Sequence, residues 1–260
     1  MTYQLVGLGT YKLQDGLCSQ IIKSGLELGY RQIDTAQLYH NHINISQGIS
    51  LSGVAREDIF IISKIHNSNI KKLKIAESID VIKKELDTNY IDLILLHNPV
   101  KNYNLAWEEL IRCKEQMGIK NIGVSNFDIN NLENIIKQTN IHPYLNQIEL
   151  NIFNQQKKLI EYNKSHGIIT QSHTTLTKSN LLNVIDLIEF AKVLKITPSE
   201  LMYKYVLDQE IGILPRTSNQ EHLVSNYKLI ENLDKKIFDL NFNHDNIDLI
   251  NKFDIGYKIY

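Results

Sequence analysis

The residues best suited to chemistry in this sequence are four polar side chains that follow short apolar runs: Asp34, Tyr39, Lys64 and His97. A free tyrosine has a pKa of about 10, which is too high for an efficient proton donor at neutral pH. A lysine ammonium beside it favours the phenolate and lowers that pKa, while an aspartate holds the lysine charged and in place. A neutral histidine can hydrogen-bond a carbonyl oxygen. The combination predicts a proton-donating site for reduction of a carbonyl group.

Each of these side chains also has an ordinary structural explanation when it is considered alone. Asp34 could cap a helix, Lys64 could lie on the surface, and His97 could be a satisfied core histidine. The chemical interpretation therefore depends on elements that bring the four side chains together.

Short β-type runs alternate with longer helix-type segments along the whole chain. We predict strands at residues 5–10, 31–34, 59–63, 91–96, 120–125, 145–150, 168–172 and 211–214. The amphipathic spacing of Leu73, Ile75, Ile79 and Leu86 predicts a helix over residues 71–88. Gly29, before the second run, is suited to closing a helix ahead of a strand.

Strands that alternate with helices indicate a parallel α/β fold, which can be an open doubly wound sheet or a closed barrel. The number of runs and the absence of a composition break favour a single (β/α)8 TIM barrel domain over residues 1–260. In such a barrel the active site lies at the C-terminal ends of the strands, where the polar residues of this chain gather. The GLG at 7–9 lacks a third glycine and is a weak dinucleotide fingerprint.

Composition excludes several other classes of protein. The 260 residues are 43% hydrophobic and carry a formal net charge of −1, which argues against a nucleic-acid or membrane partner. Cys18 and Cys113 have neither metal-binding spacing nor a second pair, so we expect two buried thiols and no metal site. The first residues lack a basic region and a long apolar stretch, so we expect no signal peptide and a cytoplasmic protein.

Seven sequence blocks resemble the aldo-keto reductase family in order and spacing. They are GLGTYKL (7–13), GYRQIDTAQLYHN (29–41), AREDIFIISK (55–64), IDLILLHNP (91–99), IKNIGVSNF (119–127), NQIELN (146–151) and ILPRTSNQEHLVSN (213–226). The resemblance covers most of the chain, and the second and fifth blocks are highly specific together.

This resemblance implies a (β/α)8 barrel and an oxidoreductase that binds NADPH without a Rossmann domain, with NADH as the alternative cofactor. Asp34, Tyr39, Lys64 and His97 match the family's catalytic tetrad. The nicotinamide would deliver hydride to a carbonyl carbon while Tyr39 supplies the proton.

The resemblance also implies a cofactor site. The matching positions are Thr10, Tyr11, Ser125, Asn126, Gln147, His173, Arg216, Thr217, His222 and Asn226. Ser125, Asn126 and Gln147 match residues that hydrogen-bond the nicotinamide carboxamide. His173 stands in place of a stacking tyrosine.

The adenosine end of this implied site departs further from the family pattern. Arg216 replaces the usual lysine, which keeps the charge and adds bidentate phosphate geometry. Thr217 keeps a hydroxyl at the start of a helix, and Asn226 matches an adenine-contacting asparagine. His222 replaces the usual arginine, which weakens recognition of the 2′-phosphate. We expect NADPH to be preferred over NADH.

The substrate walls implied by the resemblance are Tyr11, His66 and Asn98. Tyr11 keeps an aromatic wall, whereas Asn98 replaces a tryptophan and His66 stands near another expected tryptophan. The loops after the fourth and seventh strands are short, and so is the tail after Asn243. We therefore expect a polar, shallow and open site that takes small sugars or polar aldehydes.

Two other functions are open at this point. The chain could be a nicotinamide-cofactor-binding barrel with little turnover, acting as a sensor or partner subunit, because fold alone does not establish activity. An aldolase that uses Lys64 as a Schiff-base amine is disfavoured, since Asp34 should keep Lys64 protonated. We expect a monomer that binds a small-molecule carbonyl substrate.

Overall fold

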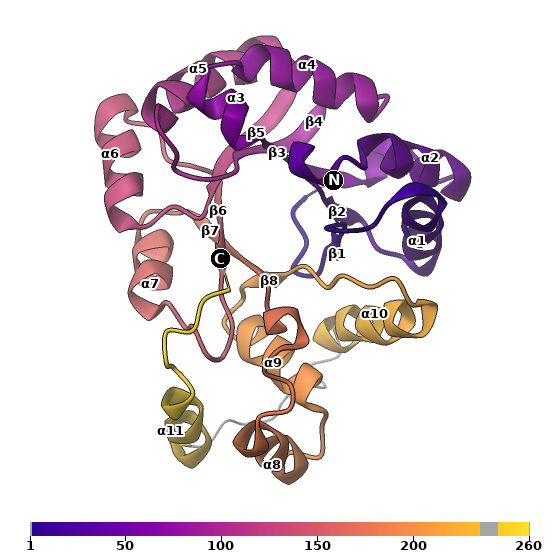
Figure 1. Cartoon of the computed structure of the whole chain (residues 1–260), viewed down its shortest axis with the longest axis vertical. Coiled ribbons are helices and arrows are strands. Elements are labelled where there is room, and N and C mark those ends of the chain that lie inside the picture. Colours follow the sequence, from indigo (N-terminus) through magenta and orange to yellow (C-terminus); the bar gives the residue numbers. More distant parts are fainter. Residues whose placement is uncertain (1, 235–243, 260) are drawn as a thin grey trace.

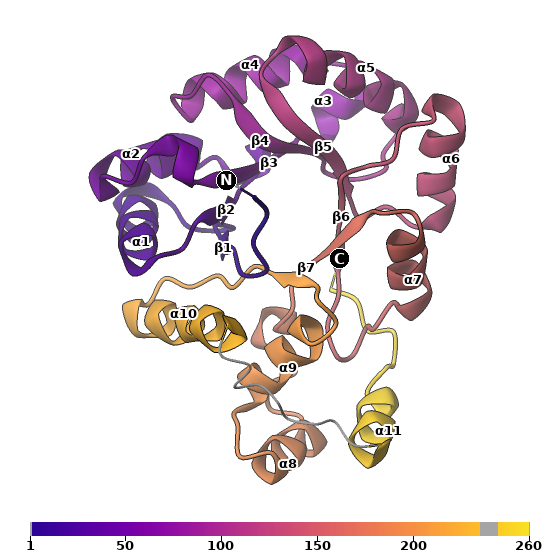
Figure 2. The ribbon, with the colours of Figure 1, turned by 180° about the vertical axis from the view of Figure 1, so that it is seen from behind.

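Eight parallel strands curl around a common axis with helices on the outside, as Figures 1 and 2 show from opposite sides. The computed structural model describes residues 2–234 and 244–259. The strands follow the order of the sequence and are β1 (Leu8–Gly9), β2 (Gln32–Asp34), β3 (Phe60–Ile65), β4 (Ile91–Leu96), β5 (Ile119–Ser125), β6 (Leu145–Glu149), β7 (Ile169–His173) and β8 (Gly212–Ile213).

Hydrogen bonds between the first and last strands close the sheet into a barrel. Val6 forms a parallel bridge with Ile213, just before β1 begins. The Ile213 amide donates to the Leu5 carbonyl at 2.7 Å, and the Gly7 amide donates to the Ile213 carbonyl at 3.0 Å. The closed barrel predicted from the number of β-type runs is therefore confirmed, and the open doubly wound sheet is excluded.

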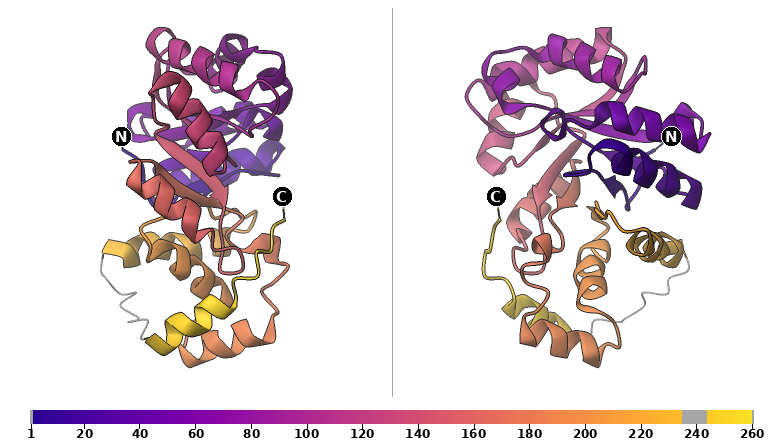
Figure 3. Two further views of the ribbon diagram at one scale, coloured as in Figure 1. Left: turned by 90° about the vertical axis from the view of Figure 1, so that its left-hand side faces the viewer. Right: turned by 45° about the vertical axis from the view of Figure 1, so that its right-hand side comes forward.

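Helices surround the strands, and α8 and α11 extend beyond the ring at one end (Figures 1 and 3). The helices are α1 (Asp15–Leu28), α2 (His42–Ser52), α3 (Asn67–Lys71), α4 (Ile75–Glu85), α5 (Tyr103–Gln116), α6 (Ile129–Thr139), α7 (Lys157–Ser165), α8 (Ile185–Val193), α9 (Pro198–Leu207), α10 (Gln220–Asp234) and α11 (His244–Lys252), with 3-10 turns η1 (Gln37–Tyr39), η2 (Arg56–Asp58) and η3 (Thr177–Ser179). Among the helices in the described residues, none has the length and apolar character needed to cross a bilayer.

The predicted termination of a helix at Gly29 is confirmed. Gly29 ends α1 in a left-handed conformation with φ of 117°. A Cβ at this position would also collide with the Tyr227 side chain. Glycine is favoured here because it has no Cβ and tolerates positive φ.

The prediction of one continuous helix over residues 71–88 was wrong in the extent of the helix. The chain forms the short α3, breaks, and then forms α4 from Ile75 to Glu85. Leu73 lies between the two helices with a left-handed φ of 53° and is exposed. Apolar spacing counted Leu73 as part of one helical face, but the turn at this residue redirects the chain.

Because successive side chains of a strand point to opposite faces, every second residue of each strand points into the barrel interior. Phe60 and Ile62 of β3 join Leu93, Leu95 and Leu145 in a buried cluster. Lys64 follows Ile62 on the same face, one step nearer the C-terminal end of the strand. The interior therefore changes from apolar to polar toward the end of the barrel that holds the site.

Candidate active site

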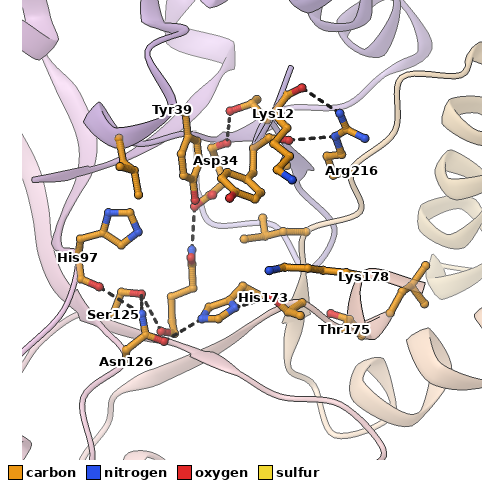
Figure 4. Close-up of a pocket in the computed structure, with 18 of the residues that line it drawn as sticks. Lys12, Asp34, Tyr39, His97, Ser125, Asn126, His173, Thr175, Lys178 and Arg216 are labelled. Carbon is orange, nitrogen blue, oxygen red and sulfur yellow. Dashed lines mark hydrogen bonds between the residues drawn. The ribbon is translucent and has the colours of Figure 1, made fainter. Parts of the chain in front are cut away.

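A cavity of about 450 Å³ lies at the C-terminal ends of the strands (Figure 4). It is lined by most of the predicted site residues, namely Thr10, Tyr11, Asp34, Tyr39, His97, Asn98, Ser125, Asn126, Gln147, His173 and Arg216. Lys64 does not line the cavity and is buried behind Asp34 and Tyr39. The fold thus gathers side chains that are separated by more than two hundred positions in the sequence.

A buried ion pair stands beside the predicted proton donor. Lys64 Nζ donates to Asp34 Oδ1 at 2.6 Å and to the Thr35 carbonyl at 3.0 Å. The same nitrogen lies 3.5 Å from the Tyr39 hydroxyl oxygen. Lys64 is 1% exposed and Asp34 is 4% exposed. Burial lowers the pKa of Lys64, and the Asp34 carboxylate opposes this shift.

Asn41, which the sequence analysis did not assign to the site, fixes the loops that carry Tyr39. Its Nδ2 donates to the carbonyls of Thr10 and Leu13 at 2.9 and 3.0 Å. Its Oδ1 accepts from the Thr35 hydroxyl at 2.9 Å. Asn41 is fully buried, so these bonds connect the loop after β1 to the end of β2. The signal available in the sequence was its place in the same block as Asp34 and Tyr39.

His97 faces the cavity in its neutral form. Its ring lies 6.1 Å from the Tyr39 ring in an edge-on arrangement. Burial, with smaller contributions from Lys64 and His173, lowers the pKa of His97 to about 3. A neutral imidazole can hydrogen-bond a carbonyl oxygen without carrying charge into the site.

The stability of the protein should depend on pH through His97 and His173, which are partly buried. The pKa of His173 is also lowered to about 3, chiefly by burial and then by Lys64. An unfolded histidine has a pKa of about 6.5, so between that pH and 3 the unfolded chain binds more protons than the folded chain. Stability should therefore fall as the pH drops through this window. Urea unfolding at pH 7 and pH 4.5 would measure this effect. The free energy of unfolding should decrease less between these two pH values for His173→Gln than for the wild type. Equal decreases would show that His173 does not cause the loss of stability in acid.

A hydrogen-bonded polar cluster forms the wall beside His97. Ser125 Oγ donates to the Gln147 carbonyl at 3.0 Å. Asn126 Nδ2 donates to the His97 carbonyl at 3.2 Å and to Asn98 Oδ1 at 3.0 Å. His173 Nε2 lies 2.8 Å from Asn126 Oδ1, so the residue that replaces the expected stacking tyrosine is tied to this cluster.

Gln147 makes a contact that the sequence analysis missed. Its Nε2 donates to Asp34 Oδ2 at 2.7 Å and to Gln171 Oε1 at 2.8 Å. Gln147 therefore supports the carboxylate that holds Lys64, in addition to lining the cavity. Nothing in the sequence links Asp34 with Gln147, because they lie on β2 and β6.

Cationic side chains line the opposite side of the cavity. Figure 4 shows Lys12, Lys178 and Arg216 across from Ser125 and Asn126. Arg216 Nε donates to the Tyr11 carbonyl and its Nη2 to the Lys12 carbonyl, each at 2.9 Å. Arg216 thus fastens the loop after β1 to the end of β8. Lys12 and Lys178 were not predicted from the sequence to belong to the site, although Lys12 lies in the first block.

The remaining predicted residues do not line this cavity. Thr217 Oγ1 exchanges hydrogen bonds with the backbone of Asn219, whose side chain caps α10. His222 and Asn226 lie on α10 itself. His66 precedes α3, where its Nδ1 accepts from the Ser68 amide. The structure therefore places His66 at a helix start, outside the cavity wall.

The C-terminal tail reaches this end of the barrel. Asn243, the start of the tail in the sequence analysis, lies outside the described residues. After α11, the Tyr257 amide donates to the Phe153 carbonyl at 3.1 Å and the Ile259 amide donates to Glu149 Oε1 at 2.7 Å. Lys258 lines a second cavity of about 320 Å³ that also borders Asn98.

Comparison with known proteins identifies the family. A model described as the Aldo/keto reductase family matches residues 6–240. Methylglyoxal reductase DkgB from Salmonella typhi is 35% identical over 231 residues, which cover 87% of this chain and 86% of that protein. The crystal structure of MGS-M4, an aldo-keto reductase from a Medee basin deep-sea metagenome library, has a TM-score of 0.89 at 27% identity, covering 100% of this chain and 94% of the other. A Gox0644 variant in complex with NADPH has a TM-score of 0.85 at 27% identity, covering 96% and 89%. The chain belongs to the aldo/keto reductase family of oxidoreductases.

Proposed function

We propose that this protein uses NADPH to reduce the carbonyl group of a small polar aldehyde or ketone, with Tyr39 as the proton donor. The observation that carries the proposal is the position of Lys64 Nζ, which lies within 2.6 Å of Asp34 Oδ1 and 3.5 Å of the Tyr39 hydroxyl. An ammonium at this position favours negative charge on the tyrosine oxygen after proton transfer.

The cavity residues fit a nicotinamide dinucleotide. Ser125 and Asn126 offer a hydroxyl and an amide group to a carboxamide on one side, and Gln147 also lines the cavity. Lys12 and Lys178, on the other side, offer positive charge to phosphate groups. The resemblance to a structure in complex with NADPH supports the same assignment. When bound, NADPH would supply hydride from its nicotinamide ring.

The chain's own residues would orient the substrate oxygen and supply its proton. Neutral His97 would hydrogen-bond the oxygen and orient the carbonyl group. Tyr39 would give its hydroxyl proton to that oxygen as negative charge develops there. Lys64 would stabilise the tyrosinate that remains, and Asp34 would hold Lys64 in place. Solvent would then restore the proton to Tyr39.

The polar wall of the cavity supports a small polar substrate. Asn98 stands beside His97 and is bonded to Asn126 and to Asn67 Oδ1, so the wall offers amide groups where an aromatic ring was expected. The relative DkgB is named a methylglyoxal reductase, and methylglyoxal is a small dicarbonyl compound. We infer that short dicarbonyl and hydroxy-aldehyde compounds are the substrates of this protein.

A turnover panel tests this proposal directly. The decrease in NADPH absorbance would be followed with methylglyoxal, glyceraldehyde, xylose and an aromatic aldehyde. We expect the highest kcat/KM for methylglyoxal and the lowest for the aromatic aldehyde. Cofactor binding by calorimetry without consumption on any carbonyl would instead favour a cofactor-binding protein.

The same panel should be repeated with NADH. We expect weaker affinity for NADH, since Arg216 and Lys178 add positive charge near the cavity. Equal affinity for the two cofactors would show that the 2′-phosphate is not recognised.

A further inference from the structure

The carboxylate of Asp34 is held from two sides by different chemistry. Oδ1 accepts from the Lys64 ammonium at 2.6 Å, and Oδ2 accepts from Gln147 Nε2 at 2.7 Å. The same Gln147 nitrogen donates to Gln171 Oε1 at 2.8 Å. Gln147 and Gln171 are directly opposite each other on β6 and β7. They are 2% and 0% exposed, so water does not compete for these bonds.

The chemistry of these groups fixes which way each amide faces. An ionised carboxylate only accepts hydrogen bonds, so Gln147 must turn its nitrogen toward Asp34. An amide nitrogen carries two hydrogens, and the second is taken by Gln171 Oε1. Rotating the Gln147 amide by half a turn would press two buried acceptor oxygens together, which is costly. The atom of the Gln147 amide that remains for the cavity is therefore Oε1.

We propose that Gln171 is a positioning residue that, together with Asp34, makes Gln147 present an acceptor, rather than a donor, to the nicotinamide carboxamide. The inference rests on the proposed function and specifies that Gln147 accepts a hydrogen bond from the carboxamide. Because Gln147 also bonds Asp34, the carboxamide contact and the Lys64–Asp34 pair share one rigid support. Gln171 does not line the cavity, and its hydrogen bond to Gln147 connects it to the site.

Removing the acceptor at position 171 tests this role. Gln171→Leu keeps the size of the side chain but leaves one buried N–H of Gln147 without a partner, so that Asp34 alone holds the amide. We expect NADPH binding, measured by calorimetry, to weaken roughly tenfold, the effect of losing one well-placed hydrogen bond. We expect kcat to fall, with little change in the KM for methylglyoxal. Gln171→Glu should recover both values, because a carboxyl oxygen still accepts from Gln147 in either protonation state.

Gln32→Leu is a matched control. Gln32 is also fully buried in the barrel interior, on the same strand as Asp34, and its Oε1 accepts from the Gln4 amide instead of from the site. This variant should lose stability yet keep the wild-type NADPH affinity and kcat. If Gln171→Leu does not fold, Gln171→Asn provides the same test, since its shorter amide cannot reach Gln147 in the same geometry.

Three results separate the possibilities. Weaker NADPH binding for Gln171→Leu, with recovery in Gln171→Glu and none of the loss in Gln32→Leu, supports the proposal. Wild-type NADPH affinity and kcat in both leucine variants overturn it and leave Gln171 as a packing residue. A wild-type protein that binds NADPH but reduces no carbonyl defeats the proposed function, while the binding measurements still decide the role of Gln171.

Discussion

Replacing Tyr39 with phenylalanine is expected to lower kcat/KM by a factor of about 10² to 10⁴, the usual contribution of a general acid. The change removes the hydroxyl that lies 3.5 Å from Lys64 Nζ and keeps the ring that packs 5.1 Å from Tyr11 and 6.1 Å from His97. The cavity walls should therefore survive, and NADPH should bind Tyr39→Phe with wild-type affinity. Steady-state kinetics with methylglyoxal and calorimetric binding would measure the two effects separately.

A second tyrosine provides a control for loss of a hydroxyl. Tyr103 is the first residue of α5 and does not line the cavity. Its hydroxyl accepts from the side-chain nitrogens (Nδ2) of Asn131 and Asn134. Tyr103→Phe should keep wild-type kinetics. If Tyr39→Phe turned over as fast as the wild type, another group would have to supply the proton.

Lys64→Met is expected to have the second largest effect, and it should reduce both activity and stability. The ammonium lies beside the Tyr39 hydroxyl, so its loss removes the charge that favours the tyrosinate. It also leaves the Asp34 carboxylate buried without the ammonium that faces it, while Gln147 still donates to it. Removing one member of a buried ion pair typically costs about 3 to 5 kcal/mol. Kinetics at neutral pH and urea unfolding would measure the two losses.

A double variant separates the two consequences of this change. Asp34→Asn combined with Lys64→Met removes both charges, and the amide of residue 34 can still accept from Gln147. We expect it to recover much of the stability lost in Lys64→Met, since neutral replacement of a buried pair is often tolerated. Activity should stay low because no ammonium faces Tyr39. Equal stability of the single and double variants would argue against an uncompensated buried carboxylate.

Much of the barrel could be predicted from the sequence because parallel strands buried on both faces leave continuous apolar runs. The runs at 59–63, 91–96 and 145–150 agree with β3, β4 and β6 to within two residues. The end strands were less well predicted, since β1 and β8 each contain only two residues. Their short hydrogen-bonded ladder depends on closure of the barrel, which is a property of the whole sheet.

The candidate site also has parts that could be predicted from the sequence and parts that could not. The place of Asp34, Tyr39 and His97 at one cavity could be predicted because each lies at or just beyond the end of a strand, and the C-terminal ends of barrel strands lie together. The supporting contacts could not be predicted. Gln171 lies in the middle of β7, whose sequence ITQSH is mostly polar and gives no indication of which residue Gln171 contacts. Its bond to Gln147 depends on the register between β6 and β7.

The sequence by itself therefore determined the order of the elements, the family and the placement of Asp34, Tyr39, Lys64 and His97 at one end of the barrel. Each of these follows from local patterns of apolar runs, polar ends and short motifs. Only the tertiary structure decided that Asp34 is shared between Lys64 and Gln147, that Arg216 fastens the loop carrying Tyr11, and that His66 caps a helix. These contacts join strands and loops far apart in the chain, and hydrogen bonding between them is fixed only once the barrel closes and sets their registers.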